Sequence, residues 1–378
     1  MKNIAIIGLI KDKNIGDAII CESVEYLCKT VAPQHNYKLV DLKGRCDKYS
    51  IIDLLLKVFN LFFKRFKIRY FEKLRFKEFI NEELKDIDLI IFAGGGIIEC
   101  EYYSCDFYLE QITEYAEKHD IRVAYNAVGF NGDYNENIVG YKVLQKVLNS
   151  RNVVSVTVRE NPAKMNNQFL QNRKATLVSD PAVWSSECYN IKKEEDSDVI
   201  GINLIRPEIF RNYGFFDVSE DDVINFLSKI IEILNKDNQK WQFFTNGYKL
   251  DYDFGIKLLQ HLNITEDQQY IKQIPATGKQ FMSDIAEYKG IICFRLHASI
   301  CSFSLGIPSI ALLWNPKQKY FYENIGCGER CLELEVDKTI DILSLFEKAI
   351  KEGYNGNVVN SFKNTSKDSL EKLLKNDC

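Results

Sequence analysis

Short apolar runs rich in β-branched residues recur along this chain, separated by longer amphipathic segments. In the first half, the runs cover residues 3–8, 37–42, 87–93, 122–128, 153–158 and 176–179. Strands that are apolar on both faces and alternate with helices are typical of a parallel sheet covered by helices. The pattern therefore predicts an α/β fold, with an N-terminal Rossmann-like domain over residues 1–188.

The same alternation of apolar runs and amphipathic segments begins again after a polar stretch at residues 185–198, which we interpret as an interdomain linker. The later apolar runs cover residues 199–204, 241–245, 290–294, 309–313 and 332–334. They predict a second Rossmann-like domain over residues 198–352. Residues 359–378 are predicted to hold a C-terminal helix that docks on a domain, with Ser366 as its N-cap.

Length and composition fit this division. A chain of 378 residues exceeds one typical core and suggests two domains of roughly 150 to 200 residues. The 49 Lys and Arg against 53 Asp and Glu give a net charge of -4, so the chain as a whole has no field that would attract nucleic acid. We therefore expect no nucleic-acid partner.

The cysteines and the N-terminus indicate the compartment. The 11 cysteines form no C-x-x-C pair and have no nearby histidine pairs, which argues against zinc and iron–sulfur sites. The first residues lack the pattern of a secretory signal, and no apolar run reaches the roughly 18 to 20 residues that span a bilayer. We expect a cytoplasmic protein with reduced thiols.

Open α/β sheets bind ligands at the carboxyl ends of their strands, so we searched the loops that follow the predicted strands. After the first strand, Gly16 permits a close backbone approach, and the amides of the following helix can receive an anion. Asp17 either caps that helix or contacts a substrate hydroxyl. This loop is the first candidate binding segment.

Three glycines, Gly94, Gly95 and Gly96, directly follow the apolar strand at residues 88–92. At a strand-to-helix turn, their N–H groups could cradle a phosphate or a carboxylate. The stretch is neither a Walker loop nor a G-x-G-x-x-G fingerprint. The alternative is a tight turn against the neighbouring strand.

Two arginines stand at strand ends, and a guanidinium there can bind an oxyanion with two hydrogen bonds. Arg159 ends the fifth strand, where the alternative is a surface ion pair with Glu160, and Arg206 follows the first strand of the second half. Asp180 follows another strand and could either cap the local chain or accept a hydrogen bond from a substrate hydroxyl. These residues suit a small, highly charged substrate.

The segment Arg295-Leu296-His297 is the strongest single candidate. A cation, an imidazole and a helix N-terminus meet within three residues of a strand end. A structural role for His297 is the alternative. Arginines at three separate strand ends indicate a ligand that carries both a phosphate and a carboxylate.

In their order, these motifs resemble those of the polysaccharide pyruvyl transferase family. The resemblance extends to about Trp314, and its specificity lies in the sequence of motifs rather than in any one of them. The matching segments are Asn14-Ile15-Gly16-Asp17, Gly94-Gly95-Gly96, Arg159, Ser179-Asp180-Pro181-Ala182, Arg295-Leu296-His297-Ala298 and Gly306-Ile307-Pro308. One stretch departs: residues 125–130 read Tyr-Asn-Ala-Val-Gly-Phe where family members often carry Gly-Gln-x-x-Gly-Pro.

The resemblance implies a GT-B-like fold, in which two Rossmann-like domains face each other across a cleft. It also implies transfer of the enolpyruvyl group of phosphoenolpyruvate onto two hydroxyls of a sugar, which forms a pyruvate ketal and releases phosphate. Arg159, Arg295 and His297 are then implied to contact phosphoenolpyruvate. The departure at residues 125–130 concerns contacts to the acceptor.

From the residues and the resemblance together, we predict the roles of individual side chains. His297 and Arg295 are the catalytic candidates, His297 as a general acid or base or as a donor to the phosphate. The predicted phosphoenolpyruvate contacts are Arg159, Arg206, Arg295, His297, Gly95 and Gly96. The predicted acceptor contacts are Asn14, Asp17 and Asp180. This chemistry requires no metal and no cofactor besides the co-substrate phosphoenolpyruvate.

The segment from Lys57 to Lys77, within a wider apolar region at residues 51–77, is strongly basic and aromatic. It holds eight Lys or Arg, one acidic residue and seven aromatic residues. We hypothesise that it attaches the protein to the anionic inner face of the cell membrane, which would suit a lipid-linked sugar acceptor. The alternative is a helix that packs its aromatic residues on the sheet or forms a dimer face.

Two other functions fit the same motifs. A GT-B-type glycosyltransferase could use the arginines to bind the diphosphate of a nucleotide sugar. A non-catalytic anion-binding or scaffold protein is the other alternative. Binding of phosphoenolpyruvate or of a nucleotide sugar would separate these hypotheses.

Overall fold

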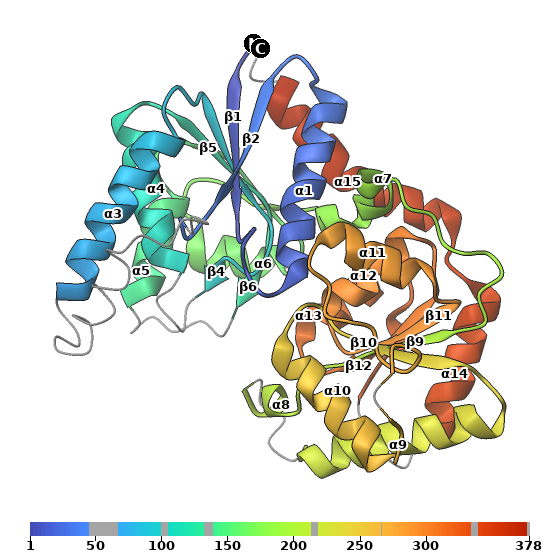
Figure 1. Cartoon of the computed structure of the whole chain (residues 1–378). Coiled ribbons are helices and arrows are strands. Elements are labelled where there is room, and N and C mark those ends of the chain that lie inside the picture. The colour runs from blue at the N-terminus through green and yellow to red at the C-terminus, as the bar shows by residue number, and fades with distance from the viewer. Residues whose placement is uncertain are drawn as a thin grey trace. The chain divides into compact units, whose positions relative to one another are not determined.

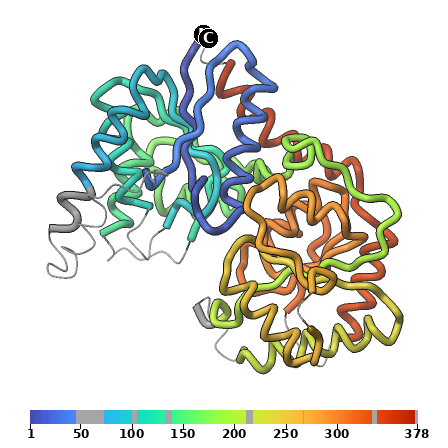
Figure 2. Tube along the Cα trace, in the orientation of Figure 1, coloured from blue at the N-terminus to red at the C-terminus, as the bar shows by residue number. Residues whose placement is uncertain are grey.

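The computed structural model describes residues 1–44, 67–99, 105–131, 139–212, 218–265, 267–333 and 339–375. The chain packs as two compact units, whose course along the sequence can be followed in Figure 2. Unit 1 comprises Met1–Lys11, Val24–Val178 and Leu370–Cys378, and unit 2 comprises Asp12–Ser23 and Ser179–Ser369. Thus the segment after the first strand packs with the second half of the chain, and the last residues pack with the first half.

Unit 1 is built on a six-stranded parallel sheet with the order β2-β1-β3-β5-β7-β8. Figure 1 labels β1, β2 and β5 of this sheet. Every residue of β3 is buried, and both residues of the edge strand β8 are exposed, as expected when helices cover the centre of a parallel sheet. The strands are β1 (Asn3–Gly8), β2 (Asn36–Asp41), β3 (Leu89–Ala93), β5 (Arg122–Val128), β7 (Val153–Val158) and β8 (Thr176–Leu177).

Helices with one apolar stripe cover this sheet. In α5, the buried residues Tyr141, Leu144 and Leu148 recur every three or four positions, which places them on one face. The longer helices of unit 1 are α3 (Lys67–Glu83), α4 (Cys105–Lys118) and α5 (Val139–Leu148). Helix α1 (Ile15–Val31) belongs to unit 2 up to Ser23 and to unit 1 from Val24 onward. A small second sheet pairs β4 (Ile98–Glu99) with β6 (Phe130–Asn131).

Unit 2 has a five-stranded parallel sheet with the order β10-β9-β11-β12-β13. Its strands are β9 (Ile200–Asn203), β10 (Trp241–Phe244), β11 (Gly290–Cys293), β12 (Ser309–Leu313) and β13 (Cys331–Glu333). Its main helices are α9 (Glu220–Lys236), α10 (Lys249–His261), α11 (Gly278–Ala286), α12 (Leu296–Ser304), α13 (Pro316–Asn324) and α14 (Thr339–Glu352). The alternation predicted for both halves is thereby confirmed.

The strand order of unit 2 reverses direction at β9. The chain places β10 on one side of β9 and β11 on the other, so the loops after β9 and β11 lead to opposite faces of the sheet. Such a switch point leaves a crevice at the carboxyl ends of the strands, which is the usual ligand site of open α/β sheets. Arg206 follows β9 and Arg295 follows β11, so two predicted site residues belong to this switch point.

Two local predictions are wrong. Helix α15 spans Gly356–Lys375, so Ser366 lies inside it and is not its N-cap; its buried hydroxyl donates to the Lys363 carbonyl at 3.0 Å. The predicted linker begins with a helix, α7 (Ser185–Tyr189), whose Ser186 hydroxyl donates to the Ser304 carbonyl at 2.8 Å. In both cases, polar residues that look solvated in the sequence are satisfied by buried hydrogen bonds.

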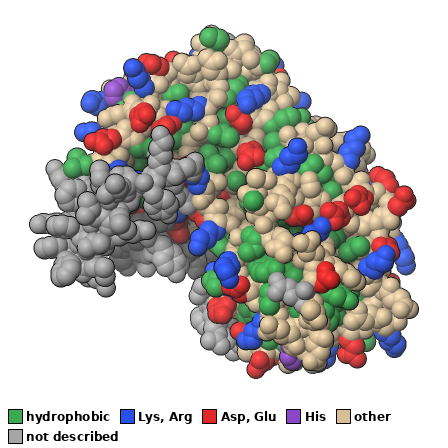
Figure 3. All heavy atoms as spheres, in the orientation of Figure 1, with side chains coloured by type: hydrophobic (Ala, Val, Ile, Leu, Met, Phe, Trp, Pro, Cys, Tyr) green, Lys and Arg blue, Asp and Glu red, His purple; other side chains and the backbone are tan. Residues whose placement is uncertain are grey.

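Most of the predicted membrane segment lies outside the described residues. At its described end in α3, Phe76 is buried and its ring lies 4.8 Å from that of Tyr108, whereas Lys73 and Lys77 are exposed. No helix in the described ranges combines the length and the hydropathy that crossing a bilayer requires. On the face shown in Figure 3, basic and acidic side chains are interspersed. Membrane attachment stays a prediction.

Candidate active site

Arg295 occupies the junction between β11 and α12 in unit 2. It stands at the N-cap position of α12, and its backbone N–H donates to Asn203 Oδ1 at 2.9 Å. Asn203 is the last residue of β9, the neighbouring strand. The side chain of Arg295 is only 9% exposed, so the two strand ends hold this guanidinium in a largely buried position.

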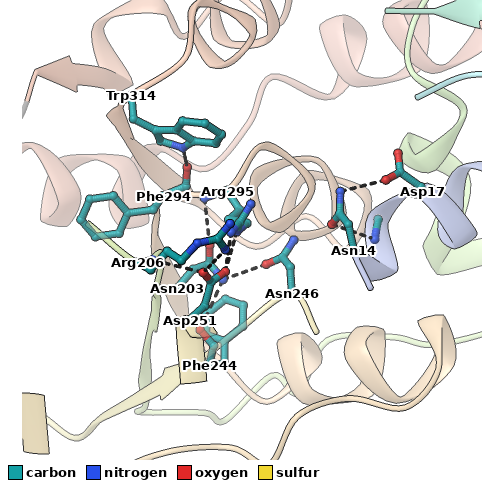
Figure 4. Close-up of polar contacts among 11 residues, drawn as sticks. Asn14, Asp17, Asn203, Arg206, Phe244, Asn246, Asp251, Phe294, Arg295 and Trp314 are labelled. Atoms are coloured by element: carbon teal, nitrogen blue, oxygen red, sulfur yellow. Dashed lines mark hydrogen bonds and ion pairs between the residues drawn. The ribbon is translucent and has the colours of Figure 1, made fainter. Parts of the chain in front are cut away.

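A buried carboxylate that the sequence analysis missed joins the two predicted arginines (Figure 4). Asp251 Oδ2 accepts from Arg295 Nε at 2.8 Å and from Nη2 at 2.5 Å. Its Oδ1 accepts from Arg206 Nη1 and from the Arg206 backbone N–H, both at 3.1 Å. Asp251 is completely buried. Two guanidinium groups against one carboxylate leave this cluster with one excess positive charge.

Aromatic rings flank the guanidinium groups. The Tyr248 ring centroid lies 4.7 Å from Arg295 Cζ and 5.3 Å from Arg206 Cζ, and the Trp314 ring lies 5.9 Å from Arg295 Cζ. These are cation–π distances, which stabilise a desolvated guanidinium. Burial raises the pKa of Tyr248 to about 12, with Arg295 opposing the shift. Tyr248 therefore stays a neutral phenol around neutral pH.

His297 lies in the first turn of α12 and is 6% exposed. Its Nε2 is 3.8 Å from Asp180 Oδ2, within ion-pair distance when the imidazole is protonated. The other oxygen, Asp180 Oδ1, accepts from the Ala182 N–H at 2.9 Å and so caps the short helix that begins at Pro181. Asp180 thus performs the capping role considered from the sequence and also faces the histidine.

The segment after β1 lies against this histidine. A Cβ placed on Gly16 would lie 2.2 Å from His297 Nδ1, so the first turn of α1 approaches the ring at a distance that only glycine permits. Asn14 immediately precedes α1, and its side-chain oxygen accepts from the Gly16 N–H at 3.4 Å. Asn14 Nδ2 donates to Asp17 Oδ2 at 3.0 Å. Asp17 therefore lies in the first helical turn and Asn14 at the capping position.

Arg159 lies in unit 1, in a buried ion pair with its neighbour in sequence. Arg159 Nε lies 2.9 Å from Glu160 Oε2, and both side chains are 5% exposed. Glu160 Oε1 accepts from the Phe130 N–H at 3.0 Å. The pair with Glu160 that the sequence suggested is present, but it is buried rather than on the surface.

The glycine turn also lies in unit 1, and here the expected strand-to-helix turn is wrong. A short strand, β4, follows the glycines, and α4 begins only at Cys105. Gly94 and Gly95 adopt positive φ angles of 31° and 74°. The Gly94 N–H donates to the Asn126 carbonyl, and the Gly129 N–H donates to the Gly95 carbonyl, both at 2.8 Å. The turn is thus joined to the end of β5.

The structure brings six of the predicted site residues into unit 2 and leaves three in unit 1. The unit 2 residues are Asn14, Asp17, Asp180, Arg206, Arg295 and His297, and the unit 1 residues are Arg159, Gly95 and Gly96. The sequence analysis missed Asp251, Tyr248 and Asn203. Asn203 had a detectable signal, as a polar residue that ends a buried strand, whereas Asp251 looks like any charged residue of an amphipathic helix.

The family model of polysaccharide pyruvyl transferase matches residues 14–316. A search of curated proteins finds no match.

Several solved structures resemble the whole chain. The UDP-GlcNAc 2-epimerase of Methanocaldococcus jannaschii has a TM-score of 0.63 at 12% identity and covers 99% of this chain and 100% of its own. The epimerase of Neisseria meningitidis bound to UDP-GlcNAc has a TM-score of 0.56 at 14% identity, with 99% and 100% covered. Sucrose-phosphate synthase of Thermosynechococcus elongatus has a TM-score of 0.55 at 12% identity, with 100% and 98% covered. These likenesses confirm the predicted GT-B-like α/β fold.

Proposed function

The chain belongs to the polysaccharide pyruvyl transferase family, and from this membership we propose that it transfers the enolpyruvyl group of phosphoenolpyruvate onto two hydroxyls of a sugar. The product is a pyruvate ketal, and phosphate is released. We further propose that the sugar belongs to a lipid-linked polysaccharide precursor. The observation that carries the proposal is the pair of arginines on Asp251, next to His297, at the switch point of unit 2.

The charges support an anionic co-substrate. Phosphoenolpyruvate carries a carboxylate and a phosphate, and the Arg206–Asp251–Arg295 cluster keeps one excess positive charge. Guanidinium groups held by a buried carboxylate and by aromatic rings are already oriented, so an anion binds them without the cost of ordering. Asp251 is therefore a positioning residue in this proposal: it fixes Arg206 and Arg295 and reduces their mutual repulsion.

The proposed reaction converts one phosphoenolpyruvate and two sugar hydroxyls into one pyruvate ketal and one phosphate. A proton is added to the methylene carbon of phosphoenolpyruvate, which becomes a methyl group, and the first sugar hydroxyl bonds to C2. The C2–O bond to phosphate then breaks, and the second hydroxyl bonds to C2 and closes the ketal. The two hydroxyls lose one proton each; one replaces the proton used at the methylene carbon and the other leaves with phosphate. The scheme requires no metal ion and no further cofactor.

His297 is the proposed proton-transferring residue or phosphate donor. An imidazole is the side chain that most often transfers protons in enzymes. The Asp180 carboxylate, 3.8 Å from Nε2, is placed to stabilise an imidazolium. Asn14, Asp17 and Asp180 stay the proposed acceptor contacts.

Arg159, Gly95 and Gly96 stay proposed contacts to phosphoenolpyruvate. The basic segment at residues 51–77 stays the proposed attachment to an anionic membrane, which would bring the protein to a lipid-linked acceptor at the inner face of the cell membrane.

Thermal unfolding with and without phosphoenolpyruvate tests the proposal without an acceptor. A ligand at about 100 times its Kd stabilises the folded state by roughly 2.7 kcal/mol, which raises Tm by a few degrees. We expect this shift in the wild type, its loss in Arg295→Ala and its retention in Arg151→Ala, an exposed arginine of unit 1. A shift with UDP-sugars but none with phosphoenolpyruvate would instead favour the glycosyltransferase.

A further inference from the structure

A chain of hydrogen bonds fixes the orientation of two buried amides beside Arg295. The Arg295 backbone N–H can only donate, so the Asn203 atom that faces it at 2.9 Å is the oxygen. Asn203 Nδ2 is therefore a donor, and the atom of Asn246 that it meets at 2.9 Å must be Oδ1. The Asn246 Nδ2 then points away from Asn203. This assignment rests on a backbone N–H, whose role as a donor is fixed.

Asn246 Nδ2 has no hydrogen-bond partner among the described residues. Asn246 is 0% exposed, and its Nδ2 makes no hydrogen bond to any residue in the described part of the chain. An amide N–H that is removed from water and left unpaired is costly, so native proteins rarely keep one unless something else receives it. A ligand that enters the site would supply the missing acceptor.

The position of Asn246 indicates where that ligand binds. Asn246 follows β10, and its backbone carbonyl accepts from the Ile15 N–H at 3.0 Å. Its neighbour Gly247 has a φ of 102°, and a Cβ there would lie 2.5 Å from the Lys13 carbonyl oxygen. Asn246 is thus joined to Arg295 through Asn203, as Figure 4 shows, and to the first turn of α1 through Ile15.

The neighbouring charges favour an anionic acceptor atom. The cations Arg295 and Arg206 share one carboxylate, that of Asp251, so these three side chains have an excess positive charge. Asp12 and Asp17 also act electrostatically on the Tyr248 ring that lies beside both guanidinium groups. An amide donor beside such a cluster complements an oxyanion, which accepts hydrogen bonds more strongly than a neutral oxygen. We propose that Asn246 is a binding residue whose Nδ2 donates to an anionic oxygen of the co-substrate held by Arg295. This inference rests on the proposed function for the identity of that co-substrate.

Two variants of nearly the same size separate binding from structure. Asn246→Asp keeps an oxygen for Asn203 but replaces the donor with a second, charged acceptor. Asn246→Leu removes both polar atoms. Asn357→Asp, on an exposed residue of α15, controls for an added carboxylate in the same unit. Calorimetric titration with phosphoenolpyruvate, orthophosphate, pyruvate and UDP gives Kd, and thermal unfolding of the free protein gives Tm.

We expect Asn246→Asp to weaken phosphoenolpyruvate binding by roughly ten- to hundredfold, the range for a lost hydrogen bond to a charged group. Asn246→Leu should weaken it less, because it adds no repulsion, although it should lower Tm more. Asn357→Asp should bind within twofold of the wild type. If Asn246→Asp weakens the binding of orthophosphate but not of pyruvate, Asn246 Nδ2 donates to the phosphate. If it weakens the binding of pyruvate but not of orthophosphate, Nδ2 donates to the carboxylate.

The inference and the proposed function fail separately. If the wild type binds phosphoenolpyruvate and Asn246→Asp binds it within threefold, the inference is overturned and the proposed function stands. If the wild type binds UDP but not phosphoenolpyruvate, and Asn246→Asp weakens UDP, the donor to an anionic oxygen stands and the proposed function fails. If Asn246→Asp stays closer to the wild type than Asn246→Leu in both Kd and Tm, the residue is only structural. A wild type that binds none of the four anions overturns both.

Discussion

The two units hold arginines at strand ends in different ways. In unit 1, Arg159 lies in a buried ion pair with Glu160, and Glu160 also accepts from the Phe130 N–H. The guanidinium and the carboxylate of this pair together carry no net charge. In unit 2, Arg206 and Arg295 share the single carboxylate of Asp251, and the cluster keeps an excess positive charge.

This difference indicates at which arginines an incoming anion gains the most binding free energy. A buried pair without net charge attracts an incoming anion less than a cluster with an excess positive charge does, because the carboxylate of the pair offsets the charge of its guanidinium. The cluster of unit 2 offers positive charge to an incoming anion, and beside it Asn246 adds a donor that has no partner in the described part of the chain. We therefore expect the substitutions with the largest effects to lie in unit 2.

The largest expected effect follows from removing the shared carboxylate. Asp251→Asn leaves two largely buried guanidinium groups without their counter-charge, and loss of one partner of a buried ion pair costs about 3–5 kcal/mol. Urea denaturation measures the free energy of unfolding. The matched control is Asp253→Asn, whose ion pair with Lys249 is solvent-exposed and should change stability by less than about 0.5 kcal/mol.

A loss of stability in Asp251→Asn no larger than that of the control would contradict the shared-carboxylate account of unit 2. It would also remove the reason for treating the two units differently, because the arginines of unit 2 would then need no buried partner.

The next effect concerns turnover rather than stability. If unit 2 performs the proton transfer, His297→Asn should lower kcat about 100-fold or more, which corresponds to roughly 2.7 kcal/mol of activation free energy. His261→Asn, at the exposed end of α10, is the control and should keep wild-type turnover. Steady-state release of phosphate from phosphoenolpyruvate with a sugar acceptor provides the measurement. A His297→Asn turnover within a few-fold of the wild type would rule out the proton-transfer role.

Much of the fold was predictable because parallel strands have a strong local signal. Short runs rich in apolar residues located all eleven strands of the two main sheets, and the strand ends then located Arg206 and Arg295. The candidate cluster could be guessed in part because each arginine follows a strand directly, and the carboxyl ends of neighbouring parallel strands share one edge.

The features of the fold and the site that the sequence did not predict depend on contacts between segments that are distant in the sequence. Asp251 lies in an amphipathic helix where a charged residue is normally solvated, and only the folded structure shows that it is buried between two arginines. Ser366 has the local appearance of an N-cap, although its hydroxyl is used inside a longer helix. The unpartnered donor of Asn246 follows from the orientation of Asn203, which no local pattern encodes.

A smaller effect tests how tightly the neutral pair of unit 1 is packed. A Cβ on Gly129 would lie 2.6 Å from Glu160 Oε1 and 2.8 Å from Arg159 Nε, so Gly129→Ala must displace the pair. Overpacking of this kind typically costs about 1–3 kcal/mol. In Gly356→Ala the new Cβ would meet no atom within 4 Å, and unfolding in urea should show a change of about 0.5 kcal/mol or less. Equal stabilities for the two variants would mean that the Arg159–Glu160 pair moves at little cost in free energy and could open to a ligand.

The smallest expected effect gives the two units opposite responses to pH. In unit 2, burial raises the pKa of Asp284 to about 6, against the opposing charge of Lys272. The folded state therefore binds more protons than the unfolded state between about pH 4 and 6, and the stability contributed by Asp284 is lost as pH rises through that window. In unit 1, burial lowers the pKa of His35, as do the N-terminal amine and Lys2. Its contribution has the opposite sign: it is fully present above about pH 6.5 and is lost as pH falls through the lowered pKa.

Urea unfolding of the wild type, Asp284→Asn and His35→Gln from pH 4 to 8 separates the two contributions. The stability of Asp284→Asn relative to the wild type should increase from pH 4 to 6.5, because the variant has no carboxylate to ionise in a buried site. The stability of His35→Gln relative to the wild type should decrease as pH rises toward 7, because the variant cannot gain from losing a proton. Curves that run parallel to the wild type would mean that neither group changes its proton affinity on folding. The contrast between the units would then rest on the arginine pairs alone.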